Sequence, residues 1–164
     1  MTTCDEIRPY RLGVGIILVN RMGQVFAGQR INTDQPAWQM PQGGIEEGED
    51  PRAAALRELH EETGTDKAEI IAETAEWLTY DLPEEMARTL WEGRYRGQKQ
   101  KWYVMRFTGT DADIALEDAG TPEFSAWRWM EFEALPALAV AFKRDLYRRL
   151  ITELGKTVQC GTEP

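Results

Sequence analysis

Few of the side chains that build disulfides and zinc sites occur in this chain: its 164 residues include two cysteines and one histidine. Cys4 and Cys160 lie near the two ends, and no Cys-x-x-Cys pair or Cys/His cluster exists. Because chain ends are often poorly ordered, we expect neither a disulfide nor a zinc site. This use of cysteine is typical of a reducing cytoplasm, which is where we expect the protein to reside.

Long apolar runs and an excess of positive charge are also missing. No stretch approaches the roughly 18 apolar residues of a membrane span. The N-terminal segment MTTCDEIRPYR carries two acids and no apolar core, unlike a secretory signal. The formal net charge is −9, whereas extensive non-specific contact with nucleic acid needs a basic surface. We therefore expect no membrane partner and no DNA partner.

The basic residues that are present fall into two clusters, from Arg94 to Lys101 and from Lys143 to Arg149. Such clusters are commonly a solvated surface. On an acidic protein they also suit a polyphosphate substrate that arrives with its cations. The charge pattern favours a short anionic ligand or the end of a nucleic acid.

The hydrophobic pattern indicates one α+β domain over residues 1–164, with its core at about 10–154, and the length fits a single domain. We expect strands at 12–20, 24–28, 101–108 and 124–130, strand character within 68–80, a short helix at 84–91 and an amphipathic closing helix at 135–154. Residues 31–41 and 110–119 are expected loops. Trp38 and Met40 of the first loop are expected to pack beneath the segment that follows it.

That segment, Gly43–Thr65 (GGIEEGEDPRAAALRELHEETGT), is the most informative part of the sequence. Asp50 is a capping residue, and Pro51 follows at the first helical position. The next twelve residues are mostly strong helix formers, and Gly64 is a typical helix stop. The sequence therefore predicts a helix that begins at Pro51 and ends before Gly64.

Three acids of this helix, Glu58, Glu61 and Glu62, have the spacing i, i+3 and i+4, which places them on one face. Like charges at this spacing repel each other, and a bound cation would offset the repulsion. Hard carboxylate ligands suit Mg²⁺ or Mn²⁺. The alternative is an ordinary solvated helix face. The fixed distances to Gly43-Gly44, Glu49 and Arg57 favour a metal site.

The order of these residues is Gly43, five residues, Glu49, seven residues, Arg57-Glu58-Leu59, one residue, Glu61-Glu62, one residue, Gly64. This pattern resembles the Nudix box, the signature of enzymes that cut phosphoanhydride bonds in nucleoside diphosphates linked to another group. Only Thr65 departs, since the family usually has an aliphatic residue there. The resemblance implies that the Gly43 carbonyl and the three glutamates hold the metal. Arg57 is expected to pair with Glu49 and to orient the carboxylates.

The flanks of the box are more specific. They read WQMPQGG at 38–44, WLTYDLP at 77–83, GQKQKW at 97–102, TPEF at 121–124, WRW at 127–129 and FKRDLY at 142–147. This series is similar to bacterial RNA pyrophosphohydrolases and to asymmetric diadenosine tetraphosphate hydrolases. Leu12-Gly13 departs from the proline-containing step usual after Tyr-Arg in these proteins. The resemblance implies the Nudix α/β/α sandwich, a mixed sheet between helices.

The resemblance also implies substrate-binding roles for a set of basic and aromatic residues: Arg11, Arg30, Tyr80, Lys99, Lys101, Phe142 and Lys143. The arginines would bind phosphates, and Phe142 would stack on a base unless it belongs to the core. Glu123 would reach the metal centre from outside the box. His60 is expected to be exposed and non-catalytic, because it occupies the free position of the box, and a turn of about 100° per residue takes it away from its acidic neighbours on the helix.

The expected reaction is Mg²⁺-dependent hydrolysis of a phosphoanhydride, with Glu62 or Glu123 as the proton acceptor and Glu61 and Arg57 as further catalytic residues. Either 5′-triphosphate RNA or diadenosine tetraphosphate is the expected substrate, and the protein is expected to be a monomer. The alternatives are a catalytically silent Nudix-fold module that binds nucleotides or RNA ends, and a house-cleaning nucleotide pyrophosphatase. Silent modules typically lose the glutamates that this chain keeps.

Overall fold

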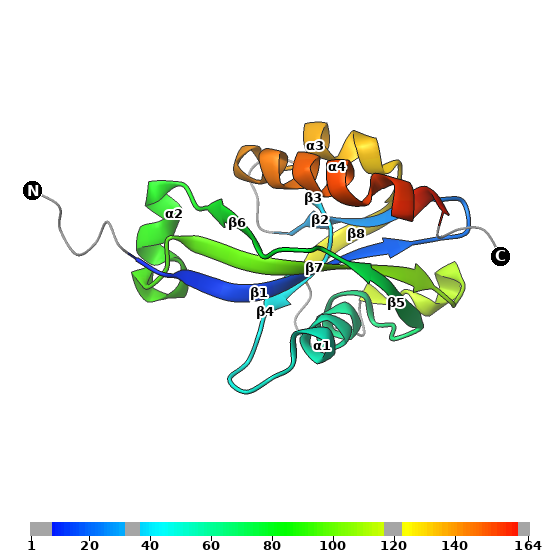
Figure 1. Ribbon diagram of the computed structural model, residues 1–164, viewed down its shortest axis with the longest axis horizontal. Helices are drawn as coiled ribbons and strands as arrows, with labels where there is room; N and C mark the ends of the chain where they lie inside the picture. Colours follow the sequence, from blue (N-terminus) through cyan, green and yellow to red (C-terminus); the bar gives the residue numbers. More distant parts are fainter. Residues whose placement is uncertain (1–7, 32–36, 117–122, 161–164) are drawn as a thin grey trace, which may run out of the picture.

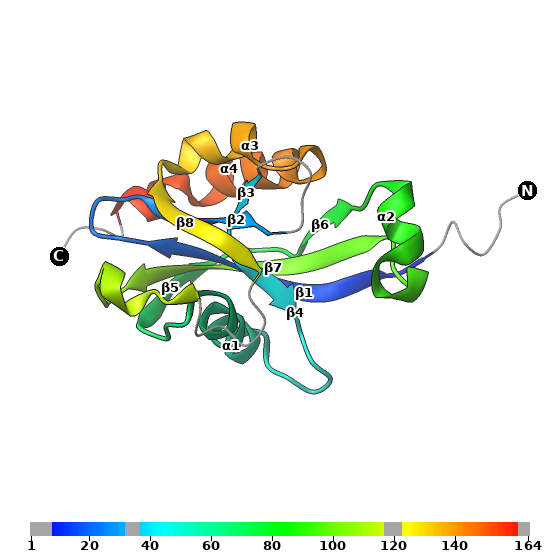
Figure 2. The ribbon, with the colours of Figure 1, turned by 180° about the vertical axis from the view of Figure 1, so that it is seen from behind.

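The computed structural model describes residues 8–31, 37–116 and 123–160. Cys4, residues 32–36 and 117–119 of the two expected loops, and Thr121-Pro122 of the TPEF segment lie outside these ranges. Within them, eight strands form one sheet, and helices cover both of its faces (Figures 1 and 2). No helix in the described ranges combines the length and the apolar character of a membrane span.

The strands are β1 (Tyr10–Val19), β2 (Val25–Arg30), β3 (Trp38–Gln39), β4 (Gln42–Gly44), β5 (Ala68–Glu73), β6 (Leu78–Asp81), β7 (Gly97–Phe107) and β8 (Phe124–Met130). The helices are α1 (Pro51–Thr63), α2 (Glu84–Thr89), α3 (Leu135–Leu138) and α4 (Arg144–Cys160), with short 3₁₀ segments η2 (Leu90–Gly93), η3 (Asp111–Asp113), η5 (Phe132–Ala134) and η6 (Ala141–Lys143). Most of these agree with the sequence prediction to within a few residues.

The sheet is mixed. Its main order is β3-β2-β1-β7-β5, while β4 pairs with β1, β6 with β7, and β8 with β2. β1 and β7 are parallel in register from Tyr10↔Gly97 to Val19↔Arg106, and the other described pairs are antiparallel. An α+β architecture with a mixed sheet between helices is thereby confirmed.

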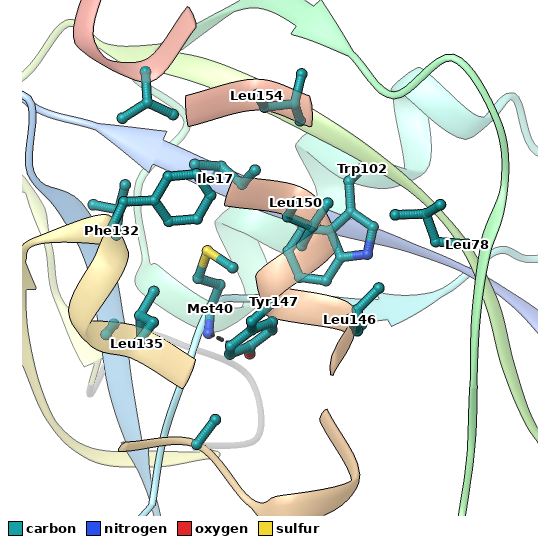
Figure 3. Packing of buried hydrophobic residues seen from close by; sticks show 14 of the residues in the cluster. Ile17, Met40, Leu78, Trp102, Phe132, Leu135, Leu146, Tyr147, Leu150 and Leu154 are labelled. Atoms are coloured by element: carbon teal, nitrogen blue, oxygen red, sulfur yellow. Dashed lines mark hydrogen bonds between the residues drawn. The ribbon is translucent and has the colours of Figure 1, made fainter. Parts of the chain in front are cut away.

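Two apolar clusters hold the layers together because successive residues of the central strands point to opposite faces. On β7, Trp102 belongs to the cluster under α3 and α4, and Tyr103 belongs to the cluster under α1. Figure 3 shows the first cluster, in which Tyr147 meets Trp102 edge to face with ring centres 6.1 Å apart. The Met40 N–H donates a hydrogen bond to the Tyr147 hydroxyl at 3.0 Å.

Trp38 and Met40 do not pack beneath α1, so this expectation is wrong. Met40 is fully buried in the cluster under α3 and α4, and Trp38 packs against the edge of the same cluster. That cluster lies on the opposite face of the sheet from α1 (Figure 1). The reason is topological, because the short strand β3 pairs with β2 before the chain crosses to β4 and the α1 side.

The expected closing helix at 135–154 is also not continuous. α3 ends after Leu138, Ala139 and Val140 are extended, and η6 leads into α4. Both helices bury apolar residues against the same face of the sheet, so the hydrophobic pattern runs through the break without revealing it. The break turns Lys143 into the protein, where its Nζ donates to Gln39 Oε1 at 3.0 Å.

Candidate active site

A cavity of about 550 Å³ opens where α1, the ends of β1 and β2, and the start of β7 come together. Among the described residues its lining contains four acids, two arginines, three glutamines, two glycines and two apolar side chains. These are Glu58, Glu61, Glu62 and Glu123; Arg11 and Arg30; Gln39, Gln42 and Gln98; Gly43 and Gly44; and Leu90 and Trp91. Carboxylates and guanidinium groups therefore line the same cavity.

Local sequence explains how α1 presents its acids. The Asp50 side chain accepts hydrogen bonds from the backbone N–H groups of Arg52 and Ala53, which caps the helix start. Gly64 is left-handed with φ of 79°, and its N–H donates to the His60 carbonyl at the helix end. The predicted helix boundaries are confirmed. Ala54, Ala55 and Leu59 are buried under α1 on the same side of the helix as Glu58 and Glu62, which anchors this side to the sheet.

Arg57 organises the acids around it. Its Nε and Nη2 donate to the two carboxylate oxygens of Glu49 at 2.8 and 2.9 Å, so the expected pair exists. Its Nη1 donates to Glu58 at 2.9 Å and to Glu61 at 3.2 Å. Nη2 also donates to the Gly44 carbonyl at 2.9 Å, which ties the glycine loop to the helix. These bonds raise the pKa of Arg57, chiefly through Glu49.

Glu58 lies directly against the glycine loop. A Cβ atom added to Gly43 would fall on the Glu58 carboxyl group, so only glycine permits this approach. Burial, and then the nearby charge of Glu61, raises the pKa of Glu58 to about 7 despite the bond from Arg57. Its negative charge is thus poorly compensated in the protein alone.

Glu62 is the most buried of the acids, with 4% of its surface exposed. Its Oε2 accepts a hydrogen bond from the Gln42 backbone N–H at 3.2 Å, whereas Oε1 has no donor among the described residues. Burial raises the pKa of Glu62, and the carboxylate of Glu123 raises it further. Two ionised carboxylates so close together repel unless a proton or a cation lies between them. Glu123, which lies outside the box in the sequence, is thus close to Glu62 in the structure.

The donor set fits a hard divalent cation in its chemistry: carboxylates of like charge, a buried oxygen without a donor, and a glycine loop that approaches them. In the described residues, however, no three His, Cys, Asp or Glu side chains converge tightly enough to form a ready-made ligand group. Arg57 holds Glu58 and Glu61 through its Nη1.

Arg11, at the start of β1, and Arg30, at the end of β2, also line the cavity. Within the described residues neither guanidinium donates a hydrogen bond to a carboxylate or forms an ion pair. The Arg11 guanidinium lies against Gly44, where an added Cβ would overlap its Nη2. A guanidinium presents a fork of N–H donors whose geometry suits phosphate or carboxylate oxygens.

Three of the other predicted substrate-binding residues lie beside the cavity. The hydroxyl of Tyr80 accepts a hydrogen bond from Gln42 Nε2 at 3.1 Å. Phe142 is half-buried, with its ring centre 5.8 Å from that of Tyr80. Burial, and then the charge of Arg30, lowers the pKa of Lys143 to about 7. These residues do not line the cavity itself but stand behind Gln39 and Gln42, which do.

Lys99 and Lys101 are not brought to the cavity. Lys99 is exposed, and the Nζ of Lys101 lies 3.5 Å from Glu73 and 3.4 Å from the Ala75 carbonyl. β7 begins at Gly97, earlier than expected, so residues alternate between faces along the whole GQKQK segment. Gln98 points into the cavity instead. His60 is exposed, as expected.

Sequence reasoning missed Gln39, Gln42, Gln98, Leu90 and Trp91. Gln98 could have been found by extending the alternation of β7 backwards from the buried Trp102 through Gln100. Gln39 and Gln42 carry no such signal, because the strands that hold them have only two and three residues. Leu90 and Trp91 reach the site through an irregular turn that no periodicity predicts.

Comparison with known proteins adds three findings. Residues 9–150 match the family model of the NUDIX domain. The chain is 57% identical over 147 residues to an RNA pyrophosphohydrolase of Rhodospirillum rubrum, which covers 90% of this chain and 88% of the relative. It is 47% identical over 155 residues to an RNA pyrophosphohydrolase of a Wolbachia strain, covering 94% and 95%.

Solved structures share the fold. A C. elegans Ap4A hydrolase in a binary complex matches with a TM-score of 0.63 and 21% identity, covering 89% of this chain and 98% of that one. The E. coli dihydroneopterin triphosphate pyrophosphohydrolase matches with a TM-score of 0.66 and 19% identity, covering 88% and 99%. At these identities the likeness concerns the arrangement of sheet and helices.

Proposed function

Because this chain belongs to the Nudix family of hydrolases, which act on phosphoanhydride bonds, we propose that it hydrolyses the 5′-triphosphate end of RNA to a 5′-monophosphate and pyrophosphate. One observation carries the proposal: a single cavity is lined by two arginines and by four carboxylates. Two of these carboxylates share Arg57, and Glu62 Oε1 has no donor among the described residues. A polyphosphate with its cations complements both groups. The relatives named RNA pyrophosphohydrolases match over about nine tenths of the chain, which supports RNA as the carrier of the phosphates.

Mg²⁺ is the cation that we propose, with Mn²⁺ as a substitute. The Gly43 carbonyl and the carboxylates of Glu58, Glu61, Glu62 and Glu123 would hold it. When bound, such an ion offsets phosphate charge and lowers the pKa of a water molecule. Arg57 would keep the carboxylates oriented through its fork with Glu49.

The protein's own groups would bind and orient the substrate. Arg11 and Arg30 would hold phosphate oxygens through charge-assisted hydrogen bonds. Phe142 would offer its ring to a base at the edge of the cavity, and Lys143 behind it would contribute to the positive potential near Gln39. Lys99 and Lys101 have no direct part in this proposal, because they point away from the cavity.

Proton acceptance falls to Glu62 or Glu123. Glu62 Oε1 lacks a donor and faces the same space as Glu123, so either carboxylate can take the proton of an attacking water. The burial that raises the pKa of Glu62 also makes it a better base near neutral pH.

Dinucleoside polyphosphates are a second proposed substrate class, with diadenosine tetraphosphate giving ATP and AMP. The observation in favour is the size of the cavity, about 550 Å³, with the apolar side chains Leu90 and Trp91 on its wall, where a second base could pack. We also propose that the protein is a monomer that works in the cytoplasm and binds neither DNA nor membranes. The cysteine usage supports the compartment, and the net charge of −9 supports the lack of a DNA partner.

A parallel assay tests the proposal. Purified protein with Mg²⁺ is given triphosphorylated RNA and diadenosine tetraphosphate, and a Glu62→Gln variant serves as the catalytic blank. We expect pyrophosphate and monophosphorylated RNA from the first substrate at the higher kcat/KM. Turnover of dihydroneopterin triphosphate or damaged nucleotides, with neither of these two substrates cleaved, would instead support the house-cleaning alternative.

A further inference from the structure

The turn that follows α2 has an unusual backbone. Trp91 and Glu92 have φ values of 51° and 60°, and Gly93 follows with φ of 71°. Three consecutive residues are thus left-handed, and the first two are not glycine. These are the positive-φ non-glycine residues of the described chain. Such conformations are strained and persist where the surrounding structure requires them, often at functional sites.

The strained turn delivers one side chain to the cavity wall. Trp91 is half-buried, lines the cavity beside Leu90, and packs against the edge of the apolar cluster under α3 and α4. Tyr95 supports it from the side, edge to face, with ring centres 6.0 Å apart. The Arg94 N–H closes the turn by donating to the Trp91 carbonyl at 3.2 Å. The indole is therefore fixed from two directions.

The group that the indole meets in the cavity is Arg11. The Arg11 Cζ lies 4.9 Å from the centre of the Trp91 ring. On another side, the same guanidinium lies so close to Gly44 that an added Cβ would overlap Nη2. Arg11 forms no hydrogen bond or ion pair with an acid among the described residues, so these two contacts hold its head group.

We propose that Trp91 is the positioning residue for Arg11: it stacks on the guanidinium and holds it against Gly44, with its donors ready for substrate phosphate. This rests on the proposed function in one respect, that the ligand carries a chain of phosphates. A long arginine side chain loses rotamer freedom when it binds, and an arginine already held in place loses less. A stack also leaves the N–H donors free, which an ion pair would not.

The alternative role for Trp91 is direct contact with the base of the substrate. The two roles differ in one respect that can be measured. If Trp91 acts through Arg11, replacing Trp91 has no further effect once Arg11 is gone. If Trp91 touches the base, its replacement weakens binding in either background. A double-mutant cycle separates the two.

The cycle comprises wild type, Trp91→Leu, Arg11→Gln and the double variant, each assayed with triphosphorylated RNA and Mg²⁺. For Trp91→Leu we expect KM to rise by about tenfold and kcat to change by less than about threefold, in line with a partly desolvated cation–π contact. Trp91→Phe should restore most of the affinity. The double variant should bind no worse than Arg11→Gln alone. Equal losses in both backgrounds would overturn the proposal, and so would an unchanged KM in Trp91→Leu.

Two additions keep the test decisive. Arg11→Lys keeps the charge but not the flat stacking group, so Trp91→Leu should have little effect on KM in that background. The melting temperatures of Arg11→Gln and Arg11→Lys show whether each variant folds. Calorimetry on the same four proteins measures their affinity for inorganic tripolyphosphate. Coupling seen there without RNA turnover would refute the RNA substrate and keep the role of Trp91. RNA turnover, together with additive effects of the Trp91 and Arg11 substitutions, would support the RNA substrate and refute the role of Trp91.

Discussion

Arg57 grips Glu49 with two parallel hydrogen bonds, of 2.8 and 2.9 Å, and so fixes the plane of its own guanidinium. Bonds from Arg57, and then from the Glu46 backbone, lower the pKa of Glu49 to about 2. The third nitrogen, Nη1, is left to hold Glu58 and Glu61. Glu49 therefore controls the orientation of two carboxylates that it does not touch.

Arg57→Lys keeps the charge but cannot form the fork, so the carboxylates lose their common anchor. We expect kcat or Mg²⁺ affinity to fall by about 10–100-fold, the usual cost of losing a residue that orients metal ligands. Arg52→Lys is the matched control, because Arg52 lies on the same helix and pairs with the exposed Glu73. Equal activity of both variants would show that charge alone suffices at Arg57.

Glu62→Gln removes the buried charge beside Glu123 while preserving the shape of the side chain. We expect kcat to fall by at least about a hundredfold, equivalent to about 3 kcal/mol of transition-state stabilisation. Glu61→Gln should behave in the same way. His60→Ala on the exposed side of the helix should leave kcat unchanged. Near-normal turnover by both glutamine variants would remove these acids from the mechanism.

Stability of the metal-free protein should depend on pH through Glu58. Its pKa is raised to about 7 by burial and the Glu61 charge, from a value of 4.5. A carboxyl with a raised pKa in the fold contributes stability below the unfolded value, and loses it as pH rises through the folded one. The melting temperature without metal should therefore contain a component that falls between pH 4.5 and about 7.

If Mg²⁺ is held by the ionised carboxylates, as proposed, its stabilising effect should grow over the same range of pH. Melting curves with and without Mg²⁺ in a pH series measure this. Glu58→Gln should flatten both dependences, whereas the exposed Glu85→Gln should leave them as in the wild type. A Mg²⁺ effect that is constant with pH would show that Glu58 is not a ligand.

Phe142→Ala separates a base platform from a core residue. The ring is half-buried against Tyr80 at the edge of the apolar cluster. We expect kcat/KM for RNA and for diadenosine tetraphosphate to fall together by about 1–3 kcal/mol. The stability loss should stay below the about 3–5 kcal/mol of a core phenylalanine, for which Phe132→Ala is the reference. A full core-sized loss in a denaturant melt, with kcat/KM unaltered, would refute the platform.

Glu92→Gly should stabilise the protein. The left-handed backbone at Glu92 costs about 1–2 kcal/mol for a residue with a side chain, and glycine gives back about 0.5–1 kcal/mol through its greater freedom in the unfolded chain. The net expected gain is about 1 kcal/mol in the free energy of unfolding. Glu85→Gly, within α2, should instead lose about 1 kcal/mol. A loss of similar size in both variants would show that the turn carries no strain.

The parts of the site that follow from local rules could be predicted from sequence. Capping by Asp50, the glycine stop at Gly64 and the 3.6-residue period fix α1, so the convergence of its acids on one face needed no further information. The Arg57–Glu49 pair was expected from the resemblance to the Nudix box, since Glu49 precedes the helix. Most strands were also predictable, because a buried run or an alternation is a property of the segment itself.

The remaining features depend on contacts between distant segments. The break at Ala139-Val140 satisfies the packing of Lys143 against Gln39, which no local pattern encodes. The face on which Lys99 and Lys101 lie follows from where β7 begins, and that is set by its pairing with β1 and β6. The conformation of Trp91 goes against the preference of its residue type and is held by tertiary packing.

The parallel pair of β1 and β7 also sets the order of events when the chain folds. Its partners, Tyr10 with Gly97 through Val19 with Arg106, are separated by more than half of the sequence. Closing so long a loop costs entropy before any contact offsets it, and such topologies fold slowly. During synthesis β1 cannot pair with β7 until β7 has been made. Arg11 and Gln98 become neighbours only then, so the cavity is completed late, after the box helix that supplies its acids has left the ribosome.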